Sequence, residues 1–412
     1  MGQLASNSKQ INRVYWLCWV VYCCSYFGRY NFSAAIADIV NQGLYTKTQM
    51  GVVGTVFFVV YGSGQLINGV LGDRFSPYKM IFFGTFVSSL ANLSMCFASN
   101  LTWLCIVWGV NGFAQSMLWA PIIFIVSNTM QGEPLKKAEA GLAATMPAGT
   151  LSAYAVTTLV IRAGSWKTVF IIASAVLMLI SLIWGVNALC LDQENRRIVP
   201  LHRQQESSAP KKSFFKVAAA SGFAFMLLPV MLHAMLKDGV MTWVPTMIME
   251  LFQVTPSFST MLTIVLPVLN FFGAVVVTII YNRGKLSEAR IACIFFAFSL
   301  LPLTALLFIR HYTPLVSVLF LSMITSAMCG INHIFLTLIP VCFAKEGRAA
   351  TMAGVIDCVA YAGSAISTYG FGKIADSFGW SKIIVFWLGF AAVGLLFCLL
   401  LIRKWENYRK TG

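Results

Sequence analysis

Apolar runs of about 20 residues recur from one end of the chain to the other, separated by short polar segments. A run of this length forms a helix that crosses a hydrocarbon core about 30 Å thick. Composition agrees, because 58% of the 412 residues are hydrophobic and only 10% are charged, whereas soluble domains carry roughly 25% charged residues. A transmembrane barrel would instead alternate apolar and polar residues. We therefore expect an all-α membrane protein.

Polar punctuation divides the chain into twelve expected transmembrane spans. They cover residues 13–40, 47–72, 78–98, 102–131, 137–162, 167–191, 216–251, 257–282, 288–309, 313–344, 349–375 and 380–403. A long polar stretch, 192–212, separates two groups of six. We expect an N-terminal six-helix bundle at 1–191, a cytoplasmic linker at 192–215 and a C-terminal six-helix bundle at 216–412.

The distribution of basic residues predicts the orientation. With the N-terminus inside, cytoplasmic segments hold 21 of the 29 Lys and Arg residues, outer segments hold six, and two lie within spans. Basic residues concentrate on the cytoplasmic side of membrane proteins. Both termini are therefore expected in the cytoplasm. The same rule explains the net charge of +15, so we expect no nucleic-acid partner.

The sequence contains no motif that indicates a catalytic site. The 11 cysteines form no CxxC pair, so neither a zinc site nor a disulfide framework is indicated. We find no phosphate-binding glycine loop, catalytic triad or metal-ligand set. The chain is not expected to be an enzyme, to use a cofactor or to bind a metal.

The two halves resemble each other. The segments RAGSW and DSFGW end at Trp166 and Trp380, 214 residues apart, and the two basic residues within spans, Arg29 and Lys237, are 208 apart. A duplicated six-span unit resembles the major facilitator superfamily. That resemblance implies a substrate site near mid-membrane at the interface of the halves.

The loop between spans two and three, GVLGDRFSPYK, is similar to the superfamily's signature gating loop. Its matching residues are Gly69, Asp73, Arg74 and Lys79. Ser76-Pro77 replaces the usual glycine, a form that resembles the organophosphate:phosphate antiporter family of glycerol-3-phosphate and hexose-phosphate transporters. The counterpart at 281–285, YNRGK, lacks the acidic residue.

Spans one and four narrow the resemblance. The run YCCSYFGRY is similar to the antiporters' first helix, in which an arginine binds the phosphoryl group, and its matching residues are Tyr22, Tyr26, Arg29 and Tyr30. In span four, GFAQSMLWAP resembles the family's Gly-x-x-Gln-x-x-x-Trp-x-Pro run and supplies Gln115 and Trp119. The resemblance implies that these residues contact the substrate.

The second half carries the other expected cation. Residues 236–245, LKDGVMTWVP, match the segment that holds it, here Lys237, and Tyr361 falls where the family has a substrate-facing tyrosine. At three positions the sequence departs from the family's pattern. The family's lysine in span two is Gln65, the span-five histidine has no counterpart in 144–149, and the charge of span eight is replaced by Pro267 with Asn270 one turn on.

Arg29 lies 16 residues beyond Arg13, about 24 Å along a helix. An ionised side chain at that depth costs at least ~2.5 kcal/mol and therefore requires a cavity or a partner. A guanidinium grips two phosphate oxygens at once, whereas Lys237 offers a point charge. An ion pair without substrate contact is the other interpretation of Arg29. Asp238 is expected to point away from Lys237, because neighbours on a helix are turned by about 100°.

Asp357 lies one turn before Tyr361, so the two share a helix face. Three roles stay open for this carboxylate, namely a counterion for Lys237 or Arg29, a proton-coupling group, and a contact to substrate hydroxyls or an amine. His333, which aligns loosely with Gln115, either faces the pathway or packs against another span. Gln65, Trp119 and Asn270 are weaker candidates for substrate contact.

The sequence thus predicts a secondary active transporter that exchanges a phosphorylated organic metabolite for inorganic phosphate by alternating access. Two alternatives remain, a proton-coupled symporter of another organic anion, such as a carboxylate or phosphonate, and a transporter-like sugar-phosphate sensor. The expected partners are the anionic substrate, inorganic phosphate and the lipid bilayer. We expect a monomer in a bacterial inner membrane.

Overall fold

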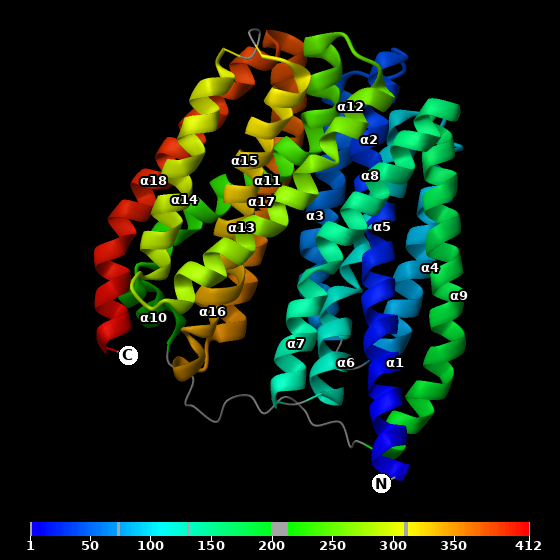
Figure 1. Ribbon diagram of the computed structural model, residues 1–412, viewed down its shortest axis with the longest axis vertical. Helices are drawn as coiled ribbons and strands as arrows, with labels where there is room; N and C mark the ends of the chain where they lie inside the picture. Colours follow the sequence, from blue (N-terminus) through cyan, green and yellow to red (C-terminus); the bar gives the residue numbers. More distant parts are fainter. Residues whose placement is uncertain (1, 72–74, 131, 199–212, 309–311, 412) are drawn as a thin grey trace. The chain divides into compact units, whose positions relative to one another are not determined.

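The computed structural model describes residues 2–71, 75–130, 132–198, 213–308 and 312–411, and these ranges are almost entirely helical, with no strand (Figure 1). The helices up to the linker are α1 (Gly2–Ser25), α2 (Phe27–Asn41), α3 (Lys47–Leu71), α4 (Pro77–Met95), α5 (Leu101–Ser116), α6 (Trp119–Thr129), α7 (Gly132–Ala143), α8 (Thr145–Ala163) and α9 (Trp166–Ile198). Beyond it lie α10 (Phe214–Ser221), α11 (Phe223–Phe252), α12 (Pro256–Thr263), α13 (Val265–Asn282), α14 (Glu288–Leu306), α15 (Pro314–His333), a π-helical turn η2 (Ile334–Leu338), α16 (Ile339–Val341), a 3₁₀ turn η3 (Ala344–Glu346), α17 (Ala349–Phe378) and α18 (Trp380–Thr411).

Each of the twelve expected spans corresponds to one helix or to consecutive helices. Nine helical stretches of the described residues are long and apolar enough to cross a membrane. The other three expected spans correspond to α1 with α2, to α4 and to α17. Large apolar side chains such as Leu159, Val186 and Leu301 are about 70% exposed, which suits contact with lipid rather than water. The expected all-α membrane fold is confirmed.

Two compact units form within the chain. The described residues of Met1–Asp38 and Val60–Arg203 make up unit 1, and those of Ile39–Val59 and Gln204–Gly412 make up unit 2. Boundaries between the units fall inside α2, after Asp38, and inside α3, after Val59.

Unit 1 is built around α4, which packs against both α5 and α9. A side chain at Gly84 would collide with the backbone oxygen of Ala114 at 2.8 Å, so the absence of a side chain lets α4 and α5 approach closely. On the other face, Ser89 Oγ donates to Ser174 O at 2.8 Å, and Trp184 Nε1 donates to Tyr78 O at 2.9 Å. These bonds satisfy polar groups that lipid cannot.

Unit 2 is built from three close helix pairs, α11 with α17, α13 with α15, and α14 with α18. Glycines permit two of these approaches. A side chain at Gly273 would overlap Ser326 of α15, and one at Gly363 would meet the backbone oxygen of Met231 of α11 at 2.5 Å. Small residues at the contact are typical of membrane helices, which gain stability from close packing rather than from excluding water.

Two helical irregularities lie near the predicted site residues. In unit 1 the helix breaks at Tyr26, between α1 and α2. In unit 2, α15 ends at His333 and continues as the π-helical turn η2. π-Helical turns inside α-helices are frequent at functional sites, because they redirect the side chains around them.

Candidate functional site

Arg29 lies near the start of α2 among tyrosines of unit 1. Its guanidinium carbon lies 4.5 Å from the centroid of the Tyr61 ring and 5.5 Å from that of Tyr26. Both rings are buried. Aromatic faces attract a guanidinium, and the attraction grows as water is excluded. The expectation that this cation lies inside the helical bundle is consistent with the half-buried Arg29 side chain.

Further aromatic rings extend this cluster. Tyr22 packs on Trp119 with centroids 4.8 Å apart and edge-on against Tyr26 at 5.4 Å, while Tyr30 stacks on Tyr26 at 5.8 Å. Tyr154 lies 6.3 Å from Tyr30. The structure thus brings together the predicted Tyr22, Tyr26, Arg29 and Trp119. The tyrosine faces constrain the plane of the guanidinium, and a planar fork of this kind suits a doubly charged oxyanion.

Tyr61 was missed by sequence reasoning, although it contacts the guanidinium more closely than Tyr26 does. It lies on α3, and the sequence offered one signal: a tyrosine in an apolar run four residues before Gln65. Positions four apart lie on the same helix face. Gln65 itself is half-buried on α3.

Lys237 lies in the middle of α11 and is held by polar groups of unit 2. Its Nζ donates to Asn332 Oδ1 at 3.1 Å and lies 3.4 Å from Asp238 Oδ1. Asp238 in turn accepts a hydrogen bond from Ser364 Oγ of α17 at 2.5 Å. The prediction that Asp238 points away from Lys237 was therefore wrong. The two side chains leave the helix in different directions, but the four-carbon stem of lysine lets its ammonium reach back to the neighbouring carboxylate.

Asn332 and His233 complete the surroundings of Lys237, and sequence reasoning missed both. His233 Nε2 lies 3.3 Å from the same Asn332 Oδ1, and Nδ1 lies 3.3 Å from Pro229 O. His233 is fully buried. A polar residue in an apolar span was the available signal at each position, because such residues almost always have a partner or a function.

The other predicted residues of unit 2 divide into two groups. The charges of Asp357 and Lys237 interact, and Tyr361 lies half-buried one turn further along α17. By contrast, Asn270 Oδ1 accepts from Thr325 Oγ1 at 2.7 Å, and His333 Nε2 lies 3.3 Å from Thr278 Oγ1. Asn270 and His333 therefore join α13 to α15, which for His333 favours the interpretation that it packs against another span.

The predicted gating loop is only partly described. Gly69 lies exposed at the end of α3 and Lys79 is exposed in the first turn of α4. Asp73 and Arg74 lie outside the described residues. The charge-assisted contacts expected of this loop therefore stay predictions.

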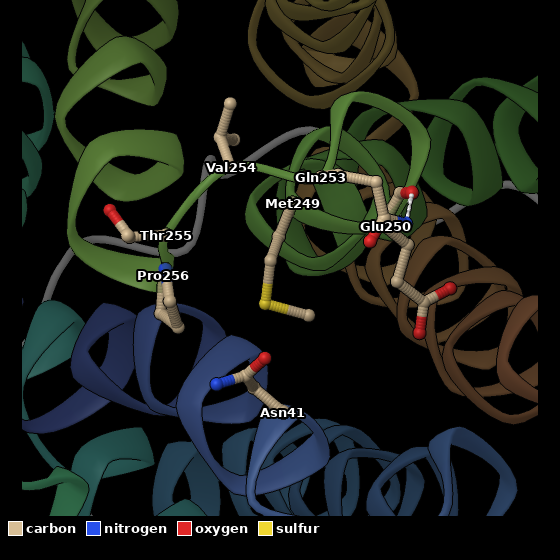
Figure 2. A pocket seen from close by; sticks show the side chains of 7 residues that line it. All are labelled: Asn41, Met249, Glu250, Gln253, Val254, Thr255 and Pro256. Carbon is tan, nitrogen blue, oxygen red and sulfur yellow. Dashed lines mark hydrogen bonds between the residues drawn. The ribbon is translucent and has the colours of Figure 1, made fainter.

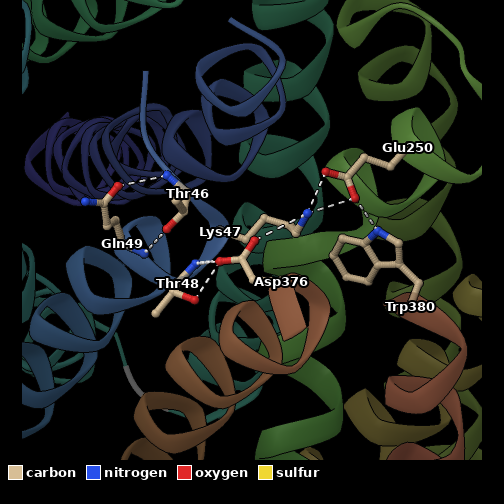
Figure 3. A network of polar contacts seen from close by, with 7 residues as sticks. All are labelled: Thr46, Lys47, Thr48, Gln49, Glu250, Asp376 and Trp380. Carbon is tan, nitrogen blue, oxygen red and sulfur yellow. Dashed lines mark hydrogen bonds and ion pairs between the residues drawn. The ribbon is translucent and has the colours of Figure 1, made fainter. Parts of the chain in front are cut away.

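Lys47, the first residue of α3, organises an ion-pair network in unit 2 (Figure 3). Its Nζ donates to the two carboxylate oxygens of Glu250 at 2.8 and 3.1 Å and lies 3.4 Å from Asp376. Thr48 donates its backbone N–H and its hydroxyl to Asp376 at 2.7 and 2.6 Å. Trp380 Nε1 donates to Glu250 at 2.7 Å. The carboxylate of Asp376 thereby caps the positive end of the helix.

Asp376 follows the expected span 349–375, and its ionisation reflects these contacts. Burial alone would raise the pKa of the Asp376 carboxyl, but the hydrogen bonds from Thr48 and the charge of Lys47 outweigh it and lower that pKa below its ordinary value. The Asp376 carboxylate is therefore charged at neutral pH.

A pocket of about 300 Å³ lies beside this network (Figure 2). Its lining residues are Asn41, Met249, Glu250, Gln253, Val254, Thr255 and Pro256. Among the described residues that line it, none is a predicted substrate contact. Across the described ranges, no group of three His, Cys, Asp or Glu side chains is arranged to hold a metal ion.

An all-helical membrane fold with cationic side chains held inside it is the arrangement of a membrane transport protein. Residues 18–368 match the Major Facilitator Superfamily, and the chain belongs to that family of transporters, which are not enzymes. The resemblance identified from the signature loop and the duplicated halves is thereby confirmed.

Curated relatives share segments of this chain. A 109-residue segment is 25% identical to a probable hexose phosphate transport protein of Chlamydia trachomatis and covers 26% of this chain and 24% of that protein. A 97-residue segment is 28% identical to the membrane sensor protein UhpC of Salmonella typhimurium, covering 24% and 22%. A 248-residue segment is 26% identical to the glycerol-3-phosphate transporter of Bacillus subtilis, covering 56% and 55%. The matched part thus spans between about a quarter and about half of each relative.

Solved structures with the same fold cover nearly the whole chain. A bacterial homolog of the human lysosomal transporter Spinster, inward-facing and unoccupied, aligns with a TM-score of 0.76 at 13% identity over 97% of this chain and 98% of that chain. The nucleoside transporter NupG aligns with a TM-score of 0.72 at 12% identity over 95% and 99%. At such identities the likeness concerns the fold alone.

Proposed function

We propose that this protein is a secondary active transporter that exchanges a phosphorylated organic metabolite, of the sugar phosphate or glycerol phosphate type, for inorganic phosphate. The observation that carries the proposal is the position of Arg29, whose guanidinium carbon lies 4.5 Å from the ring centroid of Tyr61 and 5.5 Å from that of Tyr26. The tyrosine faces hold the plane of the guanidinium, and a planar guanidinium can bind two oxygens of a phosphoryl group at once. The similarity to a probable hexose phosphate transport protein and to a glycerol-3-phosphate transporter supports the same substrate class.

Exchange has a physical reason in this proposal. An empty site leaves an ionised side chain in a medium of low dielectric constant, and a bound anion relieves that cost. The protein therefore reorients loaded more readily than empty, and each outward step with phosphate is coupled to an inward step with the metabolite. Arg29 and Lys237 are both required for this exchange, with Tyr22, Tyr26 and Tyr361 as further substrate contacts.

Lys237 gives a specific reason to keep a second candidate, proton-coupled transport of an organic anion. Two carboxylates, Asp238 at 3.4 Å and Asp357, interact with this one ammonium. A phosphate dianion that approached Lys237 would meet both negative charges. Protonation of one carboxylate removes that repulsion, so uptake of a proton together with the anion is chemically consistent with this cluster.

Sensing is the third candidate, and the similarity to the membrane sensor UhpC favours it. Such a protein would bind a sugar phosphate without carrying it across. In each case we propose the inner membrane of a bacterium, a monomer, cytoplasmic termini, and bundles at 1–191 and 216–412 joined by a linker at 192–215.

One experiment separates the three candidates. The purified full chain is reconstituted in vesicles loaded with inorganic phosphate, and entry of labelled phosphate is measured with and without external glucose 6-phosphate or glycerol 3-phosphate. An exchanger shows saturable entry that the organic phosphate inhibits and that needs no pH gradient. Entry that depends on an imposed pH gradient indicates symport. Binding of an organic phosphate by calorimetry without any entry indicates a sensor. Neither binding nor entry of any phosphorylated compound would reject the substrate class.

A further inference from the structure

The break between α1 and α2 lies three residues before Arg29. In an unbroken helix, the N–H of Arg29 would donate to the carbonyl of Ser25, four residues back. Instead it donates to Tyr26 O at 3.2 Å. The Ser25 carbonyl has lost its regular helical donor as a result. A buried backbone oxygen inside a membrane protein needs another donor, since lipid supplies none.

Side-chain amides of α5 provide donors at the break. Gln115 Nε2 donates to Ser25 O at 3.0 Å, and Asn111 Nδ2 donates to Gly28 O at 2.7 Å. These two residues are four apart on α5 and so lie on the same helix face. Together they fasten the last residue of α1 and the first turn of α2 to a neighbouring helix.

Ser88 of α4 links the two amides. Gln115 Nε2 also donates to Ser88 Oγ at 2.9 Å, and Ser88 Oγ donates to Asn111 Oδ1 at 2.6 Å. The donors therefore run in one consistent direction, from Gln115 through the serine hydroxyl to Asn111 and on to the backbone of α2. All three side chains are fully buried. Buried polar groups connected in this way hold one geometry, because any displacement leaves a group unpaired.

Gly28 shows that the contact leaves no spare room. A side-chain carbon at this position would lie 2.6 Å from Leu177 Cδ1 and 3.0 Å from both Asn92 Nδ2 and Gln115 Nε2. The absence of a side chain at Gly28 lets the amide of Gln115 approach the helix that bears Arg29 without displacing its neighbours.

We propose that Gln115 and Asn111 are positioning residues that hold the break between α1 and α2 open and thereby fix the direction of the Arg29 side chain. The proposal rests on the proposed function in one respect, that Arg29 is a ligand of the phosphoryl group. It gives Gln115 a role other than the substrate contact expected from the sequence, because both N–H bonds of its amide are directed at Ser25 and Ser88.

The test compares buried substitutions on and off this chain of hydrogen bonds. Gln115→Leu and Asn111→Leu remove the donors at the break. Ser88→Ala is a milder variant that removes only the link between the amides. Ser89→Ala is the matched control, since Ser89 is the next residue on α4, is equally buried, and donates to Ser174 of α9 instead.

Two measurements are made on the purified full chain in detergent. The first is hydrogen exchange of the backbone amides of residues 27–30, and the second is the affinity for inorganic phosphate by calorimetry. We expect Gln115→Leu and Asn111→Leu to speed hydrogen exchange of these backbone amides about tenfold, because the break opens locally more often. Phosphate affinity falls about tenfold as the guanidinium loses its direction. Ser88→Ala shows smaller changes in the same direction, and Ser89→Ala stays within about twofold of wild type in both measurements.

The outcomes separate this proposal from the proposed function. If Gln115→Leu binds phosphate more weakly while hydrogen exchange of the amides of residues 27–30 is unchanged, Gln115 is a direct ligand and the positioning role is overturned. Faster hydrogen exchange of these amides with unchanged affinity for phosphate would overturn the link to Arg29. Equal effects of Ser88→Ala and Ser89→Ala would show that loss of any buried serine hydroxyl on α4 has this effect, and would overturn a specific role for the chain of hydrogen bonds. A wild-type protein that binds no phosphate rejects the proposed function. The hydrogen-exchange rates of residues 27–30 still decide whether the side-chain amides of Gln115 and Asn111 hold the break.

Discussion

The two cations inside the membrane fold are held by different chemistry. Arg29 lies between neutral rings, 4.5 Å from Tyr61 and 5.5 Å from Tyr26. Lys237 lies against a carboxylate and an amide, 3.4 Å from Asp238 and 3.1 Å from Asn332. The rings contact the face of the guanidinium and constrain its plane, whereas the carboxylate offsets the charge of Lys237 and leaves its geometry loose. Shape should therefore matter most at Arg29, and charge balance most at Lys237.

Arg29→Lys should have the largest effect. The substitution keeps the charge but removes the planar fork that grips two oxygens and stacks on tyrosine. We expect phosphate counterflow to fall about 100-fold or more, with the protein still expressed and folded. Uptake by the variant in reconstituted vesicles tests this. Rates near those of wild type would show that position 29 needs only a positive charge.

At Lys237 the expectation is reversed. Lys237→Arg keeps the charge, so transport is retained with altered affinity, whereas Lys237→Gln removes the charge, leaves Asp238 without its ion pair and should eliminate exchange. Removing one partner of a buried ion pair is costly because the other charge remains. Phosphate counterflow of the Arg and Gln variants is the measurement. A Gln variant that exchanges as fast as wild type would limit Lys237 to a structural ion pair.

Asp357→Asn distinguishes exchange from symport with a smaller effect. If Asp357 is a counterion of Lys237, removing its charge makes the surroundings more positive, and phosphate binds at least as tightly while some exchange persists. If it carries the proton, the variant loses accumulation driven by a pH gradient but keeps counterflow. Both assays are run on the same vesicles. A variant like wild type in both would remove Asp357 from the mechanism.

Much of the fold could be predicted from the sequence because a membrane constrains helices by length and polarity. The twelve expected spans correspond to helices, although α9 continues to Ile198, past the expected end at 191. Arg29 and Lys237 are charged residues in apolar runs and followed from the same rule, whereas Tyr22, Tyr26, Gln115, Trp119 and Tyr361 followed from the family resemblance.

Contacts were harder to predict than positions. Tyr61 touches Arg29 from α3, and Asn332 reaches Lys237 from α15. No local pattern encodes such pairings, which depend on how distant helices pack. For Asp238 the opposite holds, because the helical rotation between neighbours follows from the sequence, but the ion pair also depends on the reach of the lysine stem. The break at Tyr26 also escaped prediction, since the amides that bond to the backbone beside it lie on α5, far away in the sequence.

The smallest predicted effect concerns the ion-pair network of Lys47, which lies outside the predicted substrate residues and serves as their contrast. Bonds from Thr48 and the charge of Lys47 lower the pKa of Asp376 in the folded protein despite its partial burial. A carboxyl with a lowered pKa stabilises the fold above its unfolded pKa, about 3.9, and this contribution is lost as the pH falls through the folded value. Because Asp376 is partly exposed, solvent screening limits the contribution to about 0.5 kcal/mol.

Wild type should therefore lose slightly more thermal stability than Asp376→Asn between pH 6 and pH 3, by about 0.6 °C in Tm. Thermal unfolding of both proteins across this pH range is the measurement. Glu406→Gln is the matched control, since Glu406 pairs with Arg290 at 2.6 Å elsewhere in unit 2. Removing that carboxylate leaves the Lys47 network intact, so its variant should retain the acid-dependent loss due to Asp376. Identical pH profiles for wild type and Asp376→Asn would show that the network contributes no measurable stability, and the distinction between an ion-paired region and the aromatic seat of Arg29 would then concern geometry alone.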